Sequence, residues 1–242
     1  METTASDRTL TILGFHKIGK PSAGGWESWY YISEELFVAY LTYLRDHRWH
    51  VIDVPTFLRG LDDPDSLPDR SVLITFDDGY QSIFRDALPC LRRFGYPAVS
   101  FVPTAFIGGT NSFDNGMEPE EIISGWDELR ELEESGVSIQ SHGVTHRLLS
   151  KLSPQERADE FRRSKTVIES GLSKPVDIFS FPYGDGGLDS KETAEALALA
   201  GYRAACLYGG GPNPLPVADR FRLARIAMGP DTNLDAKLTR RK

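Results

Sequence analysis

Two neighbouring aspartates, Asp77 and Asp78, stand directly after an apolar run in the stretch LITFDDGY, residues 73–80. Side chains alternate in direction along a strand, so adjacent carboxylates at a strand end point different ways. Two like charges this close raise one pKa sharply unless a cation lies beside them. A simple Asp-Gly turn would explain residues 77–79. The pair also suits a site in which one carboxylate binds a divalent cation while the other stays free as a general base.

A second chemical pattern is the stretch SHGVTH, residues 141–146, which spaces His142 and His146 four positions apart. On one turn of a helix, side chains at this spacing lie on the same face and can share a metal ion. Surface or capping histidines would give the same spacing, so the HxxxH pattern alone is weak evidence. Combined with one of the two aspartates, the histidines make a ligand set that leaves positions open for water and substrate. We therefore expect a metal site.

The elements that must position these residues are short apolar strands alternating with amphipathic helices. This order predicts an α/β fold with a parallel sheet covered by helices, either a barrel or a doubly wound sheet. The expected strands are 9–15, 50–54, 72–76, 98–102, 137–140, 178–181 and 203–207, with 221–227 as an eighth or closing segment. The expected helices begin after Ser33 and Ser82, cover 126–134 and 191–200, and follow the capping box Ser153–Glu156. Residues 1–242 show no break in composition, so we expect a single domain.

Polar residues follow several of these expected strands. His16 follows the first strand, the aspartates follow the third, the histidine pair follows the fifth, and the segment FPYG at 181–184 follows the sixth. In parallel α/β folds the active site forms from loops at the carboxyl ends of the strands. Four such segments at one rim indicate an active site more strongly than any of them alone.

Composition excludes several classes of function. The chain is 40% hydrophobic and 26% charged, as in ordinary soluble globular proteins, and its net charge of -8 argues against nucleic-acid binding. No run approaches the roughly 18 apolar residues that span a bilayer. The start, METTASDRTLTILGF, lacks the pattern of a secretion signal, so the chain as written is expected in the cytoplasm, or outside it if the sequence is a processed form. Cys90 and Cys206 are expected to be reduced core thiols.

Taken together, TFDDG, HxxxH after a strand and the later PYG resemble the polysaccharide deacetylases, the NodB-homology group or carbohydrate esterase family 4. The resemblance covers about residues 9–226 and implies a distorted (β/α) barrel with about seven parallel strands. It implies a metal-dependent hydrolase that removes acetyl groups from an N-acetylated sugar or polysaccharide. Carried over by motif, Asp77 is the general base, and the metal, zinc with cobalt or nickel as alternatives, is bound by Asp78, His142 and His146. The backbone N–H of Tyr183 is the expected donor to the oxyanion.

The chain departs from the family pattern at two places. Many members carry an arginine two residues before the proline, where this chain has Ser180, and Arg225 is expected to orient Asp77 instead. Many members also keep a histidine near the C-terminus as the general acid, whereas none of the five histidines here follows His146. The poly-N-acetylglucosamine deacetylase branch resembles the chain in both respects. His16, in GFHKI, is therefore the expected acid that protonates the leaving amine, the alternative being a histidine that only packs.

Two other functions stay open from the sequence. A cytosolic hydrolase of a small cyclic amide, or of another C–N bond, could share these motifs. A non-catalytic glycan-binding relative is the third reading; retention of Asp77 argues against it, and the missing arginine and late histidine argue for it. The aromatic segment WESWYY, residues 26–31, could line a glycan groove or anchor a lid to the core. His47 and His50 are expected to be structural, and the oligomeric state is not fixed.

Overall fold

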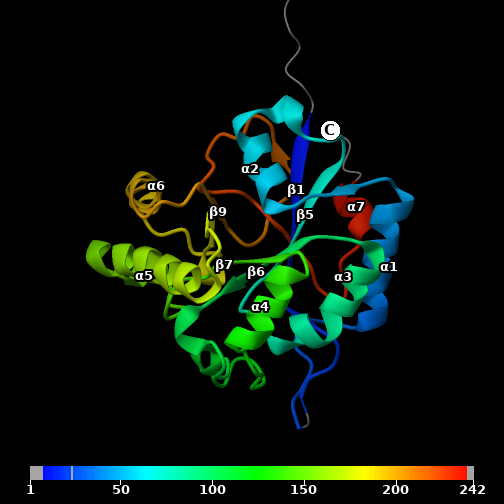
Figure 1. Cartoon of the computed structure of the whole chain (residues 1–242), viewed down its shortest axis with the longest axis horizontal. Helices are drawn as coiled ribbons and strands as arrows, with labels where there is room; N and C mark the ends of the chain where they lie inside the picture. Colours follow the sequence, from blue (N-terminus) through cyan, green and yellow to red (C-terminus); the bar gives the residue numbers. More distant parts are fainter. Residues whose placement is uncertain (1–7, 23, 239–242) are drawn as a thin grey trace, which may run out of the picture.

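The computed structural model describes residues 8–22 and 24–238 (Figure 1). The main sheet contains β1 (Thr9–Phe15), β4 (His50–Val51), β5 (Ser71–Phe76), β6 (Ala98–Val102), β7 (Val137–Ser141), β8 (Ile178–Ser180), β9 (Ala204–Cys206), β10 (Asn213–Pro214) and β11 (Ile226–Ala227). A separate parallel pair is formed by β2 (Lys17–Ile18) and β3 (Tyr31–Ile32).

The strand order of the main sheet is β10-β1-β5-β6-β7-β8-β9, with β11 also pairing with β1 and β4 with β5. Only the pairing of β1 with β10 is antiparallel among these strands. The segment before β11 pairs with β9 through a bridge between Cys206 and Leu223. The segment 221–227 therefore pairs with β9 at one end and with β1 at the other, and so closes the curled sheet into a distorted barrel. The expected fold class is confirmed, with 221–227 as the closing segment.

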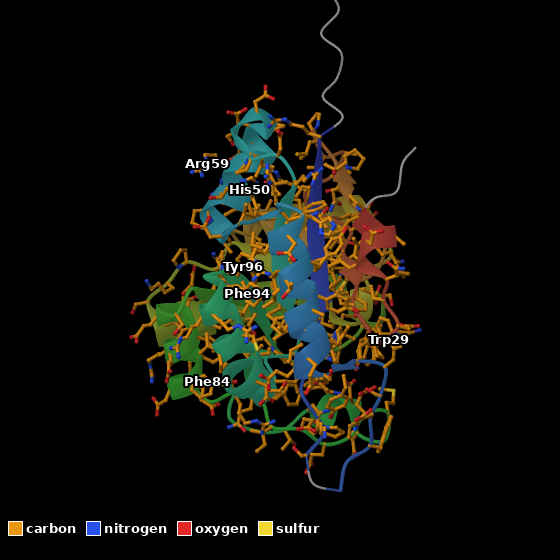
Figure 2. The ribbon with its side chains drawn as sticks, turned by 90° about the vertical axis from the view of Figure 1, so that its right-hand side faces the viewer. Trp29, His50, Arg59, Phe84, Phe94 and Tyr96 are labelled. Carbon is orange, nitrogen blue, oxygen red and sulfur yellow. The ribbon has the colours of Figure 1, made fainter. Side chains whose placement is uncertain are left out.

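The helices lie around the outside of the strands, with α5 and α6 on one side and α1 and α3 on the other (Figure 1). Their bounds are α1 (Glu34–Asp46), α2 (Val54–Asp62), α3 (Leu88–Phe94), α4 (Trp126–Glu134), α5 (Pro154–Leu172), α6 (Ser190–Leu199) and α7 (Leu234–Leu238). A π-helical turn, Ile83–Ala87, precedes α3. Figure 2 shows Phe94 and Tyr96, whose rings pack 5.6 Å apart where α3 ends.

Alternation of side chains along the strands gives the protein two hydrophobic cores. In β1, Leu13 and Phe15 belong to the larger core, which includes the apolar stripe of α1, whereas Leu10 and Ile12 belong to the smaller one. The smaller core takes its helical contribution from α2, through residues such as Phe57. Burial on both faces explains why these strands read as continuous apolar runs, as is typical of parallel sheets covered on both sides. This packing fixes the strand ends on which the polar residues stand.

Two local expectations are wrong. The strand expected over 50–54 stops at Val51, because Asp53 accepts a hydrogen bond from the Thr56 N–H at 2.9 Å and caps α2. Ser82 makes no capping hydrogen bond; its hydroxyl instead accepts one from the Ile18 N–H at 3.4 Å. The caps at Ser33 and Ser153 are confirmed, including the capping box with Glu156.

The two cysteines and His50 were expected to be structural. Cys90 and Cys206 are buried and free, as expected. His50 lies beside α2 (Figure 2), and its ring nitrogen is 2.8 Å from the carbonyl oxygen of Asp69.

Within the described part of the chain, every helix is too short or too polar to cross a lipid bilayer. The first seven residues, part of the stretch considered for a secretion signal, lie outside the described residues.

Candidate metal site and catalytic cavity

The polar residues that follow the strands meet in one cavity of about 230 Å³. It lies at the carboxyl ends of β1, β5, β7, β8 and β9, the edge at which parallel α/β folds build their sites. The structure brings His16, both aspartates, both histidines and Tyr183 to this cavity, while Arg225 lies behind Asp77. Its remaining lining residues are Lys17, Tyr30, Tyr80, Asp114, Met117, Glu118, Gly184 and Tyr208.

The side chains of Asp78, His142 and His146 form a buried cluster that fits a divalent metal ion. Asp78 Oδ1 lies 3.3 Å from His142 Nε2 and 3.1 Å from His146 Nε2, and the three ligand atoms lie within 4.8 Å of one another. Tetrahedral bonds of about 2.0–2.2 Å would place donors about 3.3–3.6 Å apart. His142 Nδ1 is 2.7 Å from the Ser180 carbonyl oxygen, which fixes the proton on Nδ1 and leaves Nε2 free as a ligand.

A loop, and not the helical turn suggested by the HxxxH spacing, brings the two histidines together. Gly143 has φ +80°, and a Cβ there would lie 2.9 Å from Glu160 Oε2, so glycine is required. The buried Glu160 carboxylate, from α5, accepts hydrogen bonds from the N–H groups of Val144 at 2.6 Å and Thr145 at 3.0 Å. Glu160 therefore holds the loop in the shape that turns both imidazoles toward Asp78.

The two aspartates point apart because the strand ends between them. The Asp77 N–H donates to the Phe15 carbonyl at 2.9 Å and continues the pairing of β5 with β1. Asp78 and Gly79 have φ +69° and +68°, a left-handed conformation that aspartate tolerates better than most residues. The Asp-Gly turn and the pair of carboxylates are thus one feature. The turn directs Asp78 to the histidines, while Asp77 stays in line with the strand and pairs with Arg225 at the cavity.

Asp77 forms a two-pronged ion pair with Arg225. Nη1 of Arg225 is 2.7 Å from Asp77 Oδ1 and Nη2 is 2.6 Å from Oδ2, and both residues are buried. Arg225 also donates to the Leu207 carbonyl at 2.7 Å and to the Ser180 hydroxyl at 2.8 Å. Burial raises the pKa of Asp77, but the charges of Arg225 and His142 outweigh it and hold that pKa below its usual value. Asp77 is therefore ionised at neutral pH. Ser180 is therefore a third partner in this pair.

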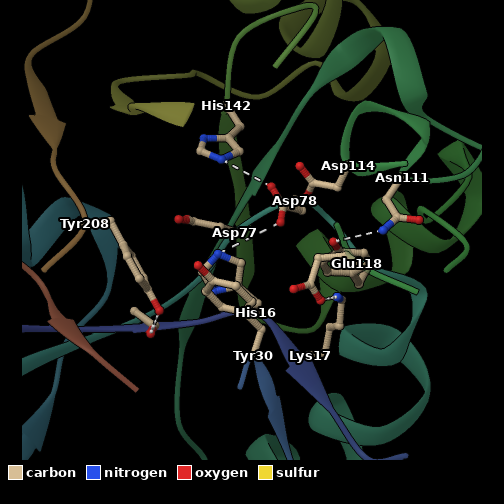
Figure 3. Close-up of polar contacts among 12 residues, drawn as sticks. His16, Lys17, Tyr30, Asp77, Asp78, Asn111, Asp114, Glu118, His142 and Tyr208 are labelled. Carbon is tan, nitrogen blue, oxygen red and sulfur yellow. Dashed lines mark hydrogen bonds and ion pairs between the residues drawn. The ribbon is translucent and has the colours of Figure 1, made fainter. Parts of the chain in front are cut away.

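His16 faces Asp78 from the side opposite His142 (Figure 3). Its Nε2 lies 3.9 Å from Asp78 Oδ2, and its ring packs against Tyr30 at 4.5 Å and edge-on against Tyr208 at 4.9 Å. Burial lowers the pKa of His16 more than the carboxylates of Asp78 and Asp77 raise it. The imidazole at rest is therefore neutral near pH 7, and a proton that it acquires during a reaction is readily given up.

Tyr183 occupies the middle of a 3-10 turn, Pro182–Gly184, after β8. At this second position of a short helix the backbone N–H has no carbonyl partner within the helix. Tyr183 has φ +57° and Gly184 has φ +69°, and a Cβ on Gly184 would lie 3.0 Å from backbone and side-chain atoms of Tyr208. Gly184 is therefore required for this tight turn, which brings Tyr183 to the cavity lining.

Lys17, Asp114 and Glu118 also face the cavity, although no sequence pattern pointed to them. Lys17 is only 1% exposed, and its ammonium is 2.7 Å from Glu118 Oε2 (Figure 3). The ammonium also lies over the rings of Tyr31 and Tyr80, at 4.8 and 4.7 Å from their centroids. The one available clue was the position of Lys17 between His16 and the apolar Ile18. The two acidic residues come from the loop after β6, whose path no periodicity predicts.

The aromatic segment 26–31 divides between the two roles considered for it. Tyr30 lines the cavity beside His16. Trp29 packs on Gly229 and donates a hydrogen bond to Asp231 at 2.7 Å, so it ties the loop to the C-terminal segment. Trp26 is 53% exposed and does not line the cavity.

Comparison with known proteins gives consistent matches. Residues 65–205 match the family model described as polysaccharide deacetylase. The protein YxkH of Bacillus subtilis is 26% identical over 200 residues, which cover 83% of this chain and 64% of that protein, less than two thirds of its length. The poly-beta-1,6-N-acetyl-D-glucosamine N-deacetylase of Staphylococcus epidermidis is 24% identical over 214 residues, covering 84% of this chain and 69% of that protein.

A solved structure supports the fold. The Streptococcus pyogenes deacetylase PplD, determined in complex with acetate, superposes with a TM-score of 0.81 at 20% identity and covers 97% of this chain and all of that one. At this identity the likeness establishes the distorted barrel and nothing further.

Proposed function

Because the chain belongs to the polysaccharide deacetylase family, we propose that it is a metal-dependent hydrolase that removes acetyl groups from an N-acetylated sugar or polysaccharide. The observation that carries the proposal is the division between the aspartates. Asp78 lies within ligand distance of two imidazoles, while Asp77 stays outside that cluster, paired with Arg225. A site that only binds a glycan has no use for a second, unligated carboxylate.

The residues have separable roles in this reaction. A divalent cation held by Asp78, His142 and His146 would supply a Lewis acid for the acetyl carbonyl and acidify water. Asp77, kept ionised and oriented by Arg225, takes the proton of the attacking water. The Tyr183 N–H donates to the oxygen that becomes negative in the tetrahedral intermediate. His16, neutral at rest, relays the proton taken up by Asp77 to the departing amine, or it stabilises the intermediate through its N–H.

Zinc is the metal that we propose, with cobalt or nickel as alternatives. Two imidazoles and one carboxylate are the ligand set of several catalytic zinc sites, and a site with three protein ligands keeps positions open for the reaction. The ligand set suits all three ions, so the metal bound by the purified protein decides between them.

The proposed substrate is a glycan of N-acetylglucosamine, the class named in the matched staphylococcal deacetylase. The cavity of about 230 Å³ is smaller than the roughly 300–1,000 Å³ of typical small-molecule pockets. It therefore suits the acetamido group and part of one sugar ring, with the rest of a longer substrate outside. Tyr30 and Tyr208 offer ring faces and edges beside His16 for such a ring.

Acetate release from N-acetylglucosamine oligomers, measured with and without a chelator, tests the proposal. Acetate that appears only with metal supports a deacetylase, and Asp77→Asn is the matched inactive variant. Ammonia or a ring-opened product from a cyclic amide would instead support the alternative hydrolase. Retention of the oligomers without turnover would identify a glycan-binding relative. Action in the cytoplasm, and as a single domain of residues 1–242, stays a prediction that fractionation and limited proteolysis test.

A further inference from the structure

The side chain of Tyr183 makes a long-range hydrogen bond that the proposed reaction does not itself require. Its hydroxyl donates to Asp114 Oδ1 at 2.8 Å, across 69 positions of sequence. The residue is 47% exposed, so burial alone does not hold the ring in place. Its backbone has φ +57°, a conformation that non-glycine residues adopt only when their surroundings enforce it. The ring also packs edge-on against His146 at 4.6 Å.

Asp114 is buried and is held in place by backbone hydrogen bonds of its own loop. It is 7% exposed, and its N–H donates to the Asn111 carbonyl at 2.9 Å, while its own carbonyl accepts from Met117 at 2.9 Å and Glu118 at 3.1 Å. Asn111 is itself buried, and its side chain bridges the Pro119 carbonyl at 3.0 Å and the Glu121 N–H at 2.8 Å. Figure 3 shows Asn111 and Asp114 side by side at the cavity edge. The loop that carries Asp114 is therefore fixed by its own hydrogen bonds, whereas the Tyr183 side chain is exposed.

We propose that Asp114 is a positioning residue: by accepting the hydrogen bond of the Tyr183 hydroxyl, it holds the strained Pro182–Gly184 turn so that the Tyr183 N–H faces the cavity. The loop after β6 thereby controls a donor on the loop after β8. The catalytic meaning of this contact rests on the proposed function, which makes that N–H the oxyanion donor. The restraint on the backbone does not rest on it.

A direct role of Asp114 in binding substrate predicts a different result. A carboxylate that contacts the sugar would change KM when it is removed, and Tyr183→Phe would leave that contact intact. A carboxylate that acts through Tyr183 changes kcat, because the oxyanion donor matters in the transition state and not in the ground state. The two variants Asp114→Ala and Tyr183→Phe break the same bond from opposite ends, so their effects should not multiply.

The kinetic test compares Tyr183→Phe, Asp114→Ala, their double variant and Asp114→Asn on N-acetylglucosamine oligomers with metal saturating. We expect kcat to fall about tenfold in each single variant with KM within about twofold, since a lost hydrogen bond to a charged group is worth this much. The double variant should be no slower than either single one, and Asp114→Asn, which can still accept the bond, should recover most of the loss. Wild-type kcat in Tyr183→Phe, or losses that multiply, would overturn the proposal.

A second measurement is independent of activity. The NMR order parameter of the Tyr183 amide should be near the rigid value of about 0.85 in the wild type and should fall toward about 0.6 in Tyr183→Phe and Asp114→Ala. Unchanged order parameters in both variants would overturn the proposal, whatever the kinetics. If the wild type released no acetate, the proposed function would fail, while the order parameters would still decide whether Asp114 restrains the turn.

Discussion

Replacing Arg225 by methionine tests how the protein keeps the buried carboxylate of Asp77 ionised. Arg225 is fully buried and makes both prongs of its ion pair with Asp77 at 2.6–2.7 Å. Methionine fills a similar volume without the charge, so the change leaves Asp77 buried and without its principal partner. Removing one member of a buried ion pair costs about 3–5 kcal/mol of unfolding free energy.

That loss converts into a measurable melting shift. For a chain of 242 residues, 1 kcal/mol corresponds to about 2–4 °C, so Arg225→Met should lower Tm by roughly 6–20 °C at pH 7. The double variant Asp77→Asn with Arg225→Met removes the stranded charge and should regain most of the loss. Arg222→Met, an exposed position in the same segment, is the matched control and should stay within about 0.5 kcal/mol.

The same variant should change the dependence of stability on pH. In the wild type the pKa of Asp77 lies below its usual value, so the pair contributes stability above the unfolded pKa of about 3.9 and loses it as the pH falls through the folded pKa. Without Arg225, burial raises that pKa. The penalty of Arg225→Met is then full at pH 7 and shrinks as Asp77 becomes protonated at lower pH.

Thermal and urea unfolding of the chelated proteins at pH 7 and pH 5 measure these quantities. A Tm loss below about 2 °C for Arg225→Met would refute the reasoning, because 1 kcal/mol is far less than a stranded buried charge costs. A double variant as unstable as the single one would also refute it, since the damage would then come from lost packing.

Three further predictions concern the base, the metal loop and a helix cap. Asp77→Asn should keep its metal and lose at least about 100-fold in acetate release, the contribution of a general base; lost metal would mean that the aspartates have exchanged roles. Glu160→Ala should weaken metal binding about 10- to 100-fold by calorimetric titration, because Glu160 holds the loop of His142 and His146; an unchanged affinity would contradict that support. Ser153→Ala removes the cap at the start of α5 and should lower the free energy of unfolding in urea by about 1 kcal/mol. It should leave acetate release unchanged, because Ser153 does not line the cavity; a loss of activity would contradict this separation.

Sequence patterns predicted the elements whose causes are local. The apolar run of β1 and the capping box of α5 each carry their own signal within a few residues. The α2 helix was missed because the apolar residues before Asp53 continue a strand pattern. The cap at Asp53 and the proline at the helix start were the better signals there.

The site was predictable in its chemistry and less so in its geometry. The spacing of His142 and His146 pointed to the right pair for the wrong reason, because Gly143 and Glu160 shape a loop where a helical turn was assumed. Arg225 could be suggested only because Ser180 stands where the family pattern has an arginine. Its position behind Asp77 depends on how the last strand closes the barrel. Asp114 stands in a long loop, and loop paths depend on tertiary contacts that no short-range pattern records.

The metal content of the purified protein tests the central claim most directly. Elemental analysis should find about one divalent cation per chain in the wild type and in His47→Ala, a histidine remote from the cluster. It should find little in His142→Ala, which removes one of the two imidazoles facing Asp78. Equal metal in the wild type and His142→Ala would contradict the account.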